Sequence, residues 1–271
     1  MSPTQPEPVV VWSREPQDRE GTPLVVMLHG YGSHEHDLFG LVPSLPEEFT
    51  YASLRAPVPM GHGGYTWFDL DPERLAYSSA AARDAVEDLW SWIASVKDQH
   101  TSVTLLGFSM GMAMATSLLR ARPEEFAAVV GLSGFAVDPG ESPEMQDWFD
   151  DAALATRRVP FFWGRDQDDP IIPEEHIDYT HRWANSSVDL TKVLYAAPAT
   201  VWCPRRSPMW ASSSPTWCCG LGVRPDAPED HLDGARPHSL CTYLTLRSLH
   251  SAAGEMTALG SPSSSPSSRT T

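Results

Sequence analysis

Two spacings of apolar residues alternate along the first 196 positions of the chain. Short, continuous apolar runs are typical of strands buried on both faces, and they occur at 9–12, 24–28, 50–54, 102–106, 126–130, 159–163 and 188–195. Helical spacing separates these runs at 78–98, 110–120 and 173–183, with a shorter segment at 37–46 that two prolines interrupt. Strands that alternate with helices predict an α/β fold with a mostly parallel, doubly wound sheet and helices on both faces.

The longest expected helix, over 78–98, has one apolar face. Either Ser78 or Ser79 is suited to cap its first turn. The residues expected on the apolar face are Ala81, Ala85, Leu89, Trp92 and Val96.

The pattern breaks down after residue 196. The remaining segment is rich in Pro, Ser, Arg and Trp, and it shows neither strand nor helix periodicity. Such a composition predicts disorder. We therefore expect one folded domain over 1–196, with residues 1–8 loose, followed by an irregular C-terminal tail over 197–271.

Charge and hydropathy restrict the partners of the protein. A net charge of −16 and a pI near 4.9 argue against nucleic acid or an anionic membrane as a partner. No apolar run reaches the roughly 18 residues of a membrane span. The N-terminus has no basic region followed by an apolar one, so no signal peptide is expected and a cytoplasmic location is predicted. Nothing in the pattern indicates an oligomeric state.

The strongest chemical motif is Gly107-Phe108-Ser109-Met110-Gly111, which reads G-x-S-x-G between an expected strand and an expected helix. That context is the one in which this motif presents a nucleophilic serine. The glycines permit a sharp turn, and the N-terminus of the following helix stabilises a developing oxyanion. The alternative is an ordinary glycine-rich turn. We interpret Ser109 as a candidate nucleophile.

A second motif follows the strand at 24–28 and reads Leu28-His29-Gly30-Tyr31-Gly32. A tight turn here would direct the backbone N–H of Tyr31 toward the substrate oxygen, beside the N–H of Met110. Two such donors form an oxyanion hole, and loss of one donor typically lowers the rate about 100- to 1000-fold.

Two metal-site alternatives were weighed against this interpretation. One uses the loop residues His29, His34, His36 and Asp37, and the other uses the tail residues Cys203, Cys218, Cys219 and Cys241. Neither set has the spacing of a usual zinc site. No metal is therefore expected, and the two histidines later in the loop are expected to be solvated.

A third motif, GRDQDDPIIP over 164–173, again follows an expected strand. A carboxylate here could orient a histidine and stabilise its imidazolium form. Asp166, Asp168 and Asp169 are all candidates, and Asp169 directly precedes Pro170. The alternative is a solvated acidic loop.

These motifs together resemble those of the phospholipase/carboxylesterase family of α/β-hydrolases, which includes the acyl-protein thioesterases. The similar segments lie in the family's order between residues 24 and 195: LHGYGSHEHDL, the stretch from Ala56-Pro57 to Trp67-Phe68-Asp69, GFSMG and WGRDQDDPIIP. The resemblance implies the α/β-hydrolase fold and a small-molecule ester substrate, with no cofactor.

The resemblance also implies roles for particular residues. Ser109 would be the nucleophile and Asp169 the acid of the triad, while the Tyr31 and Met110 amides would form the oxyanion hole. Trp67 would shape the floor near the acyl site, although core packing is an equally good interpretation of this residue.

One essential residue is missing from the matching position. The family places its catalytic histidine in a G-H-G turn just after the last strand, where this chain reads YAAPATVW over 195–202. The other histidines are poor substitutes because they lie in the oxyanion turn, in loops, on the helix after the acid or in the tail: His29, His62, His100, His176, His181, His231, His238 and His250.

A reading frame that slips by one base near Ala196–Ala197 would explain the tail. The printed residues then largely fix the last two bases of each parental codon, and the first base is left to choice. With GC-rich codons, residues 197–217 back-read as GTGHGVVPEEVADVGEFLAHV. This string contains a G-H-G turn with histidine at position 200, and then an amphipathic helix that begins Pro-Glu-Glu.

The sequence thus supports two main hypotheses. The first is a serine carboxylesterase that hydrolyses short to medium acyl esters or thioesters through an acyl-enzyme. The second is a catalytically inactive hydrolase-fold protein that keeps a pocket for small apolar ligands. Without a general base, turnover in such a triad falls by about 10⁶.

Overall fold

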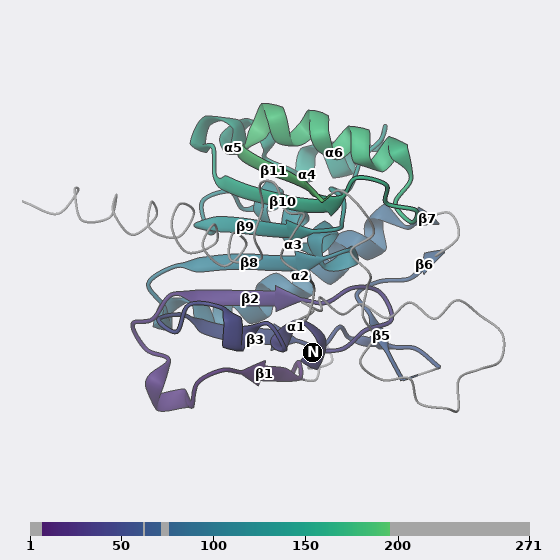
Figure 1. Ribbon diagram of the computed structural model, residues 1–271. Coiled ribbons are helices and arrows are strands. Elements are labelled where there is room, and N and C mark those ends of the chain that lie inside the picture. The colour runs from purple at the N-terminus through teal and green to yellow at the C-terminus, as the bar shows by residue number, and fades with distance from the viewer. Residues whose placement is uncertain (1–6, 62, 72–75, 196–271) are drawn as a thin grey trace, which may run out of the picture.

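A seven-stranded sheet forms the centre of the molecule (Figure 1). The structure is a computed structural model, and it describes residues 7–61, 63–71 and 76–195. The strand order is β1-β3-β2-β8-β9-β10-β11. All neighbours pair in parallel except β1 and β3. The strands are β1 (Val10–Trp12), β2 (Leu24–Leu28), β3 (Thr50–Leu54), β8 (Val103–Phe108), β9 (Ala128–Leu132), β10 (Pro160–Asp166) and β11 (Asp189–Tyr195). The predicted mostly parallel sheet is confirmed.

Helices cover both faces of the sheet, as expected. One face packs against α2 (Ser79–Val96), α3 (Met110–Ala121), α4 (Pro143–Trp148), α5 (Asp151–Arg157) and α6 (Glu174–Ser187). The other face packs against α1 (His36–Phe39), which is labelled beside β3 in Figure 1, and against the 3₁₀ turn η2 (Val42–Ser44). The smaller elements are η1 (Pro16–Asp18), η3 (Lys97–Gln99) and the two strand pairs β4 (Val58–Pro59) with β5 (Tyr65–Thr66) and β6 (Leu70–Asp71) with β7 (Ala76–Tyr77).

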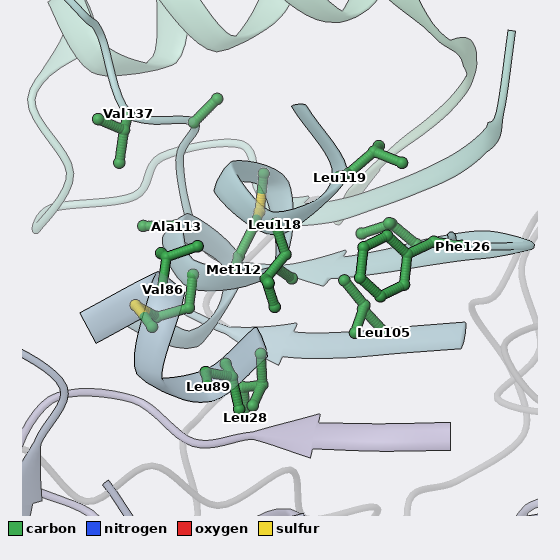
Figure 2. Packing of buried hydrophobic residues seen from close by; sticks show 14 of the residues in the cluster. Leu28, Val86, Leu89, Leu105, Met112, Ala113, Leu118, Leu119, Phe126 and Val137 are labelled. Carbon is green, nitrogen blue, oxygen red and sulfur yellow. The ribbon is translucent and has the colours of Figure 1, made fainter. Parts of the chain in front are cut away.

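The larger core lies beneath α2 and α3. Figure 2 shows side chains from these helices meeting those of the central strands, with Met112 and Leu118 of α3 above Leu105 of β8. These three side chains are completely buried. Burial of one such side chain contributes about 1.5–3 kcal/mol, so the helix that begins at the G-x-S-x-G motif is held firmly on the sheet.

The apolar face of α2 was predicted one position out of phase. The buried residues are Ala82, Val86, Leu89 and Ile93, whereas the other four residues that we expected on this face are only partly buried at its margin. Tryptophans at the edge of a helical stripe shift the apparent apolar centre, because their rings reach the core from a flanking position. Ser78 caps this helix, with its Oγ accepting from the N–H of Ala81.

Strand ends also differ from the predictions. The strand expected at 126–130 runs from Ala128 to Leu132, because its start is fixed by pairing with β8, and β10 continues beyond Trp163 to Asp166 because it pairs with the end of β11. The sequence analysis missed α4 and α5, although Ser142 and Asp150 supply their N-caps.

The register of the parallel strands brings their carboxyl ends to one edge. Leu28 lies opposite Gly107, Phe108 opposite Leu132, and Leu132 opposite Gly164. The loops that follow β2, β8, β9 and β10 therefore emerge side by side. Ligand sites of open α/β sheets occur at this edge, and all three chemical motifs lie there.

Candidate active site

Ser109 lies in a strained turn between β8 and α3. Its φ of 52° and ψ of −116° fall in a region that residues other than glycine rarely occupy. The serine N–H donates to the carbonyl oxygen of Leu132 at 2.9 Å, and the serine carbonyl accepts from the N–H of Met112 at 2.9 Å. Strain of this kind costs about 1–3 kcal/mol and persists only where the surroundings enforce it.

The two glycines of the motif are required by close approaches. A Cβ on Gly107 would lie 2.4 Å from the carbonyl carbon of Gly111, and a Cβ on Gly111 would lie 1.9 Å from the carbonyl oxygen of Leu28. Both distances are far below van der Waals contact. The sharp strand-to-helix turn predicted from the motif therefore has a steric basis in the structure.

The turn after β2 lies against this serine. A Cβ on Gly30 would be 3.4 Å from the Cβ of Ser109 and 3.1 Å from the ring of Phe108. Within the described residues, the backbone N–H groups of Tyr31 and Met110 donate to no protein acceptor. Tyr31 follows the contacting glycine directly, and Met110 is the first residue of α3, so both donors flank the serine.

His29 supports this turn and has no free nitrogen. Its Nδ1–H donates to the carbonyl oxygen of Gly30 at 2.8 Å, and its Nε2 accepts from the N–H of Ala56 at 3.0 Å. Burial lowers the pKa of His29 to about 4, so the ring is neutral at neutral pH. The expectation that this histidine belongs to the turn, and does not serve as the base, agrees with both contacts.

Trp67 lies behind the same turn. The indole Nε1–H donates to the carbonyl oxygen of His29 at 2.9 Å, and the two rings are 5.3 Å apart. Only 4% of the tryptophan is exposed. It therefore packs in the core and holds the turn after β2 in place, while its contact with an acyl group stays a prediction.

The acidic loop after β10 holds one of its three aspartates most firmly. The Oδ1 of Asp169 accepts from the backbone N–H of Ile171 at 2.9 Å and of Ile172 at 3.2 Å. Asp166 instead caps its own turn by accepting from the N–H of Asp168, which is exposed. Asp169 is half-buried, and its carboxylate is fixed from one side.

Sheet order relates this loop to the nucleophile. One strand, β9, separates β8 from β10, so Ser109 and Asp169 emerge at the same edge two strands apart. The residue after β9, Ser133, also has a positive φ of 43° and donates its N–H to the carbonyl oxygen of Gly164 at 2.8 Å. A Cβ on the next residue, Gly134, would lie 2.6 Å from the carbonyl oxygen of Ser109. Sequence reasoning missed this Ser-Gly pair, whose only signal is its position after a strand.

No histidine of the described ranges is hydrogen-bonded to Ser109 or Asp169. His100 lies at the opposite end of β8 and bonds Thr22, and His176 packs against Phe135 with ring centroids 5.0 Å apart. His34 and His36 are exposed, as expected. His62, His231, His238, His250 and position 200 lie outside the described residues.

Two kinds of site are absent from the described part of the chain. It contains no group of three or more His, Cys, Asp or Glu side chains arranged to hold a metal ion. It also contains no helix long and apolar enough to cross a membrane. The tail cysteines lie outside this part.

A mostly parallel sheet with a serine on a strained strand-to-helix turn defines an α/β-hydrolase. The chain belongs to the phospholipase/carboxylesterase family, whose model matches residues 9–201. This membership places the chain among the esterase-type hydrolases, which act on small molecules. The resemblance seen in the sequence is thereby confirmed.

Solved structures show the same fold. A carboxylesterase from Bacillus cereus is 16% identical with a TM-score of 0.56, covering 70% of this chain and 84% of that chain. A phospholipase/carboxylesterase from Dyadobacter fermentans is 17% identical with a TM-score of 0.54, covering 72% and 91%. Acyl-protein thioesterase 2 from Zea mays is 18% identical with a TM-score of 0.52, covering 70% and 90%.

Proposed function

We propose that this chain is the frameshifted form of a serine carboxylesterase for short to medium acyl esters or thioesters. The observation that carries the proposal is the position of Ser109, on a strained turn that lies against the Gly30–Tyr31 turn. The serine Oγ would attack the acyl carbonyl carbon, and the Tyr31 and Met110 amides would stabilise the resulting oxyanion.

The remaining steps need a histidine. In the proposed mechanism this residue takes the Ser109 proton and then delivers it to the leaving oxygen or sulfur, while Asp169 stabilises the imidazolium. Water, deprotonated by the same base, then hydrolyses the acyl-enzyme and frees the acid. The amides that hold one side of the Asp169 carboxylate leave its other oxygen for this task.

The shifted reading frame would supply that histidine at position 200. Its support comes from the back-reading of residues 197–217 and from the family match, which ends at residue 201. Sequencing of the gene across codons 190–205 tests this part directly. A shifted frame that cannot encode the G-H-G turn would refute it.

The decisive experiment compares two proteins. One is the printed chain, and the other carries the back-read segment GTGHGVVPEEVADVGEFLAHV in place of residues 197–271. We expect only the restored protein to hydrolyse p-nitrophenyl butyrate, and Ser109→Ala to abolish this activity. Activity of the printed chain through Ser109 would show that another histidine serves as the base.

A second candidate function is ligand binding without turnover. It is favoured by one observation, that no described histidine bonds Ser109. An inactive binder would retain a butyrate ester unchanged, and restoring position 200 would produce no hydrolysis. Equilibrium binding of the ester, followed by product analysis, separates this function from the esterase.

A further inference from the structure

An ion pair between Glu35 and Arg55 lies close in sequence and in space to the turn that holds Tyr31. The side chain of Glu35 is only 2% exposed, and both of its oxygens are bound by Arg55. The Nε of Arg55 donates to Oε2 at 2.7 Å, and its Nη2 donates to Oε1. These hydrogen bonds lower the pKa of Glu35 to about 2, so the carboxylate is charged although it is buried.

Arg55 attaches this carboxylate to the central sheet. The residue directly follows β3, and its backbone N–H donates to the carbonyl oxygen of Val9 at 2.9 Å. Because β3 is paired on both sides, the position of this arginine backbone is fixed. Its planar guanidinium binds a carboxylate with two parallel hydrogen bonds, which sets orientation as well as distance.

The same guanidinium stacks on Tyr65, whose backbone is hydrogen-bonded to the turn. The Arg55 Cζ lies 4.7 Å from the centre of the Tyr65 ring. The Tyr65 carbonyl accepts from the N–H of Gly32 at 2.9 Å, and the Tyr65 N–H donates to the carbonyl of Ser33 at 2.8 Å. Tyr31 therefore lies between Gly30, which contacts Ser109, and Gly32, which is bound to Tyr65.

We propose that Glu35 and Arg55 are positioning residues that hold the Tyr31 amide at the distance from Ser109 that an oxyanion requires. The pair restrains the turn at two points. Glu35 lies in the chain that directly follows the turn, and Arg55 stacks on Tyr65, whose backbone is bonded to Gly32 and Ser33. The inference rests on the proposed function, since it concerns the oxyanion turn of that reaction. Neither side chain contacts the reacting atoms.

Loss of one partner has a defined consequence. A buried carboxylate without its guanidinium is strongly unfavourable, so the segment that carries it moves toward water. In Arg55→Met that segment is the loop after Tyr31. Glu35→Gln removes the negative charge and also the bidentate pairing with Arg55. Arg55→Lys keeps the positive charge but lacks the planar guanidinium that binds both carboxylate oxygens.

Amide hydrogen exchange of the full printed chain tests the geometry without any catalysis. In Glu35→Gln and Arg55→Met we expect the Gly32 N–H to exchange at least about 10-fold faster, with amides of β8 unchanged. Glu87→Gln is the matched control, because Glu87 of α2 is also paired with an arginine, Arg122, but away from the turn. Equal exchange at Gly32 in the control and in the two variants overturns the proposal.

Kinetics of the restored protein add a second readout. Displacement of one oxyanion donor predicts a kcat about 10- to 100-fold lower with KM within about 2-fold, and an intermediate kcat in Arg55→Lys. A purely structural role would lower the amount of folded protein and leave kcat per folded molecule unchanged. If the restored parent hydrolyses nothing, the proposed function fails, and the exchange result alone decides the role of the ion pair.

Discussion

Ser109 keeps an unfavourable backbone conformation because its neighbours leave no alternative. Its N–H is bound to Leu132 and its carbonyl to Met112, and the glycines on both sides lie against backbone atoms. The strain is therefore maintained by packing that is independent of the catalytic base. The turn at Ser109 can thus form in a chain that lacks the proposed base.

The contact of Gly111 with β2 gives the first prediction. Gly111→Ala places a methyl group 1.9 Å from the carbonyl oxygen of Leu28, so β2 and α3 must move apart. We expect a loss of at least about 2 kcal/mol in the free energy of unfolding, measured by urea denaturation. Gly61→Ala is the control, because nothing lies within 4 Å of the added methyl group. Equal midpoints for the two variants would contradict the steric interpretation.

The buried imidazole of His29 gives a pH dependence with a defined sign. Its pKa falls from the ordinary 6.5 to about 4 in the folded protein. Between these values the unfolded chain binds a proton that the folded chain excludes, so stability is present at pH 7 and declines as the pH falls. From pH 7 to pH 5 this residue should cost about 2 kcal/mol.

Urea denaturation of His29→Gln at both pH values provides the comparison. The variant is less stable overall, but its stability should fall by about 2 kcal/mol less between pH 7 and pH 5. Burial also lowers the pKa of His100 and of His176, and these residues are present in both proteins, so the difference isolates His29. An identical pH dependence in the two proteins would mean that His29 is not neutral in the fold.

At the scale of elements, Arg120 joins α3, the helix that begins after Ser109, to α5 and α6. This residue of α3 is 1% exposed and binds both oxygens of Asp151 in α5, at 2.9 and 2.7 Å. It also donates to the hydroxyl of Tyr179 in α6 at 3.0 Å. Since α6 directly follows the Asp169 loop, this network ties the two halves of the site together.

Arg120→Leu should therefore destabilise the protein strongly. Removal of one partner of a fully buried ion pair costs about 3–5 kcal/mol, and because the Asp151 side chain is 37% exposed we expect a loss toward the lower end of this range. Arg83→Leu serves as the control, because its contact with Glu144 is 4.0 Å long and exposed, and such pairs contribute less than about 1 kcal/mol. Thermal unfolding of the two variants tests the contrast, which would be refuted by similar midpoints.

Elements were predictable from sequence where one short-range signal determines them. The continuous apolar runs located every strand of the main sheet, and G-x-S-x-G located the turn that holds Ser109. Strand ends at Leu132 and Asp166 were not predictable, because partners far away in sequence set them. The Glu35–Arg55 pair was missed for the same reason, since twenty positions of chain separate the two residues and no motif singles out either of them.

At the scale of the whole molecule, the two faces of the sheet are covered unequally by the described residues. Five helices pack on the α3 face, whereas only α1 and η2 pack on the face that contains Val130, Leu132 and Phe162. The back-read tail would add one amphipathic helix after β11, and this helix would cover part of one sheet face. The printed tail has no such apolar periodicity.

Restoration of the shifted frame should therefore change the colloidal behaviour of the protein. Val130, Leu132 and Phe162 are themselves buried, so the expectation rests on the helix that the printed tail does not encode. Without that helix we expect the printed chain to expose more apolar surface, to bind the dye ANS and to elute partly as aggregate. The restored chain should show neither property in size-exclusion chromatography at the same concentration. A monodisperse printed chain without ANS binding would show that its tail already protects the sheet.

The topology also sets the order in which a ribosome completes this protein. The turns that hold Tyr31 and Ser109 and the loop that holds Asp169 all precede β11, which is an edge strand and the last strand of the sheet. Only the proposed base comes later. Under the proposed function, a genetic lesion after β11 would remove the base and leave all seven strands of the sheet encoded. The gene could then lose its activity in one step and still encode a recognisable hydrolase.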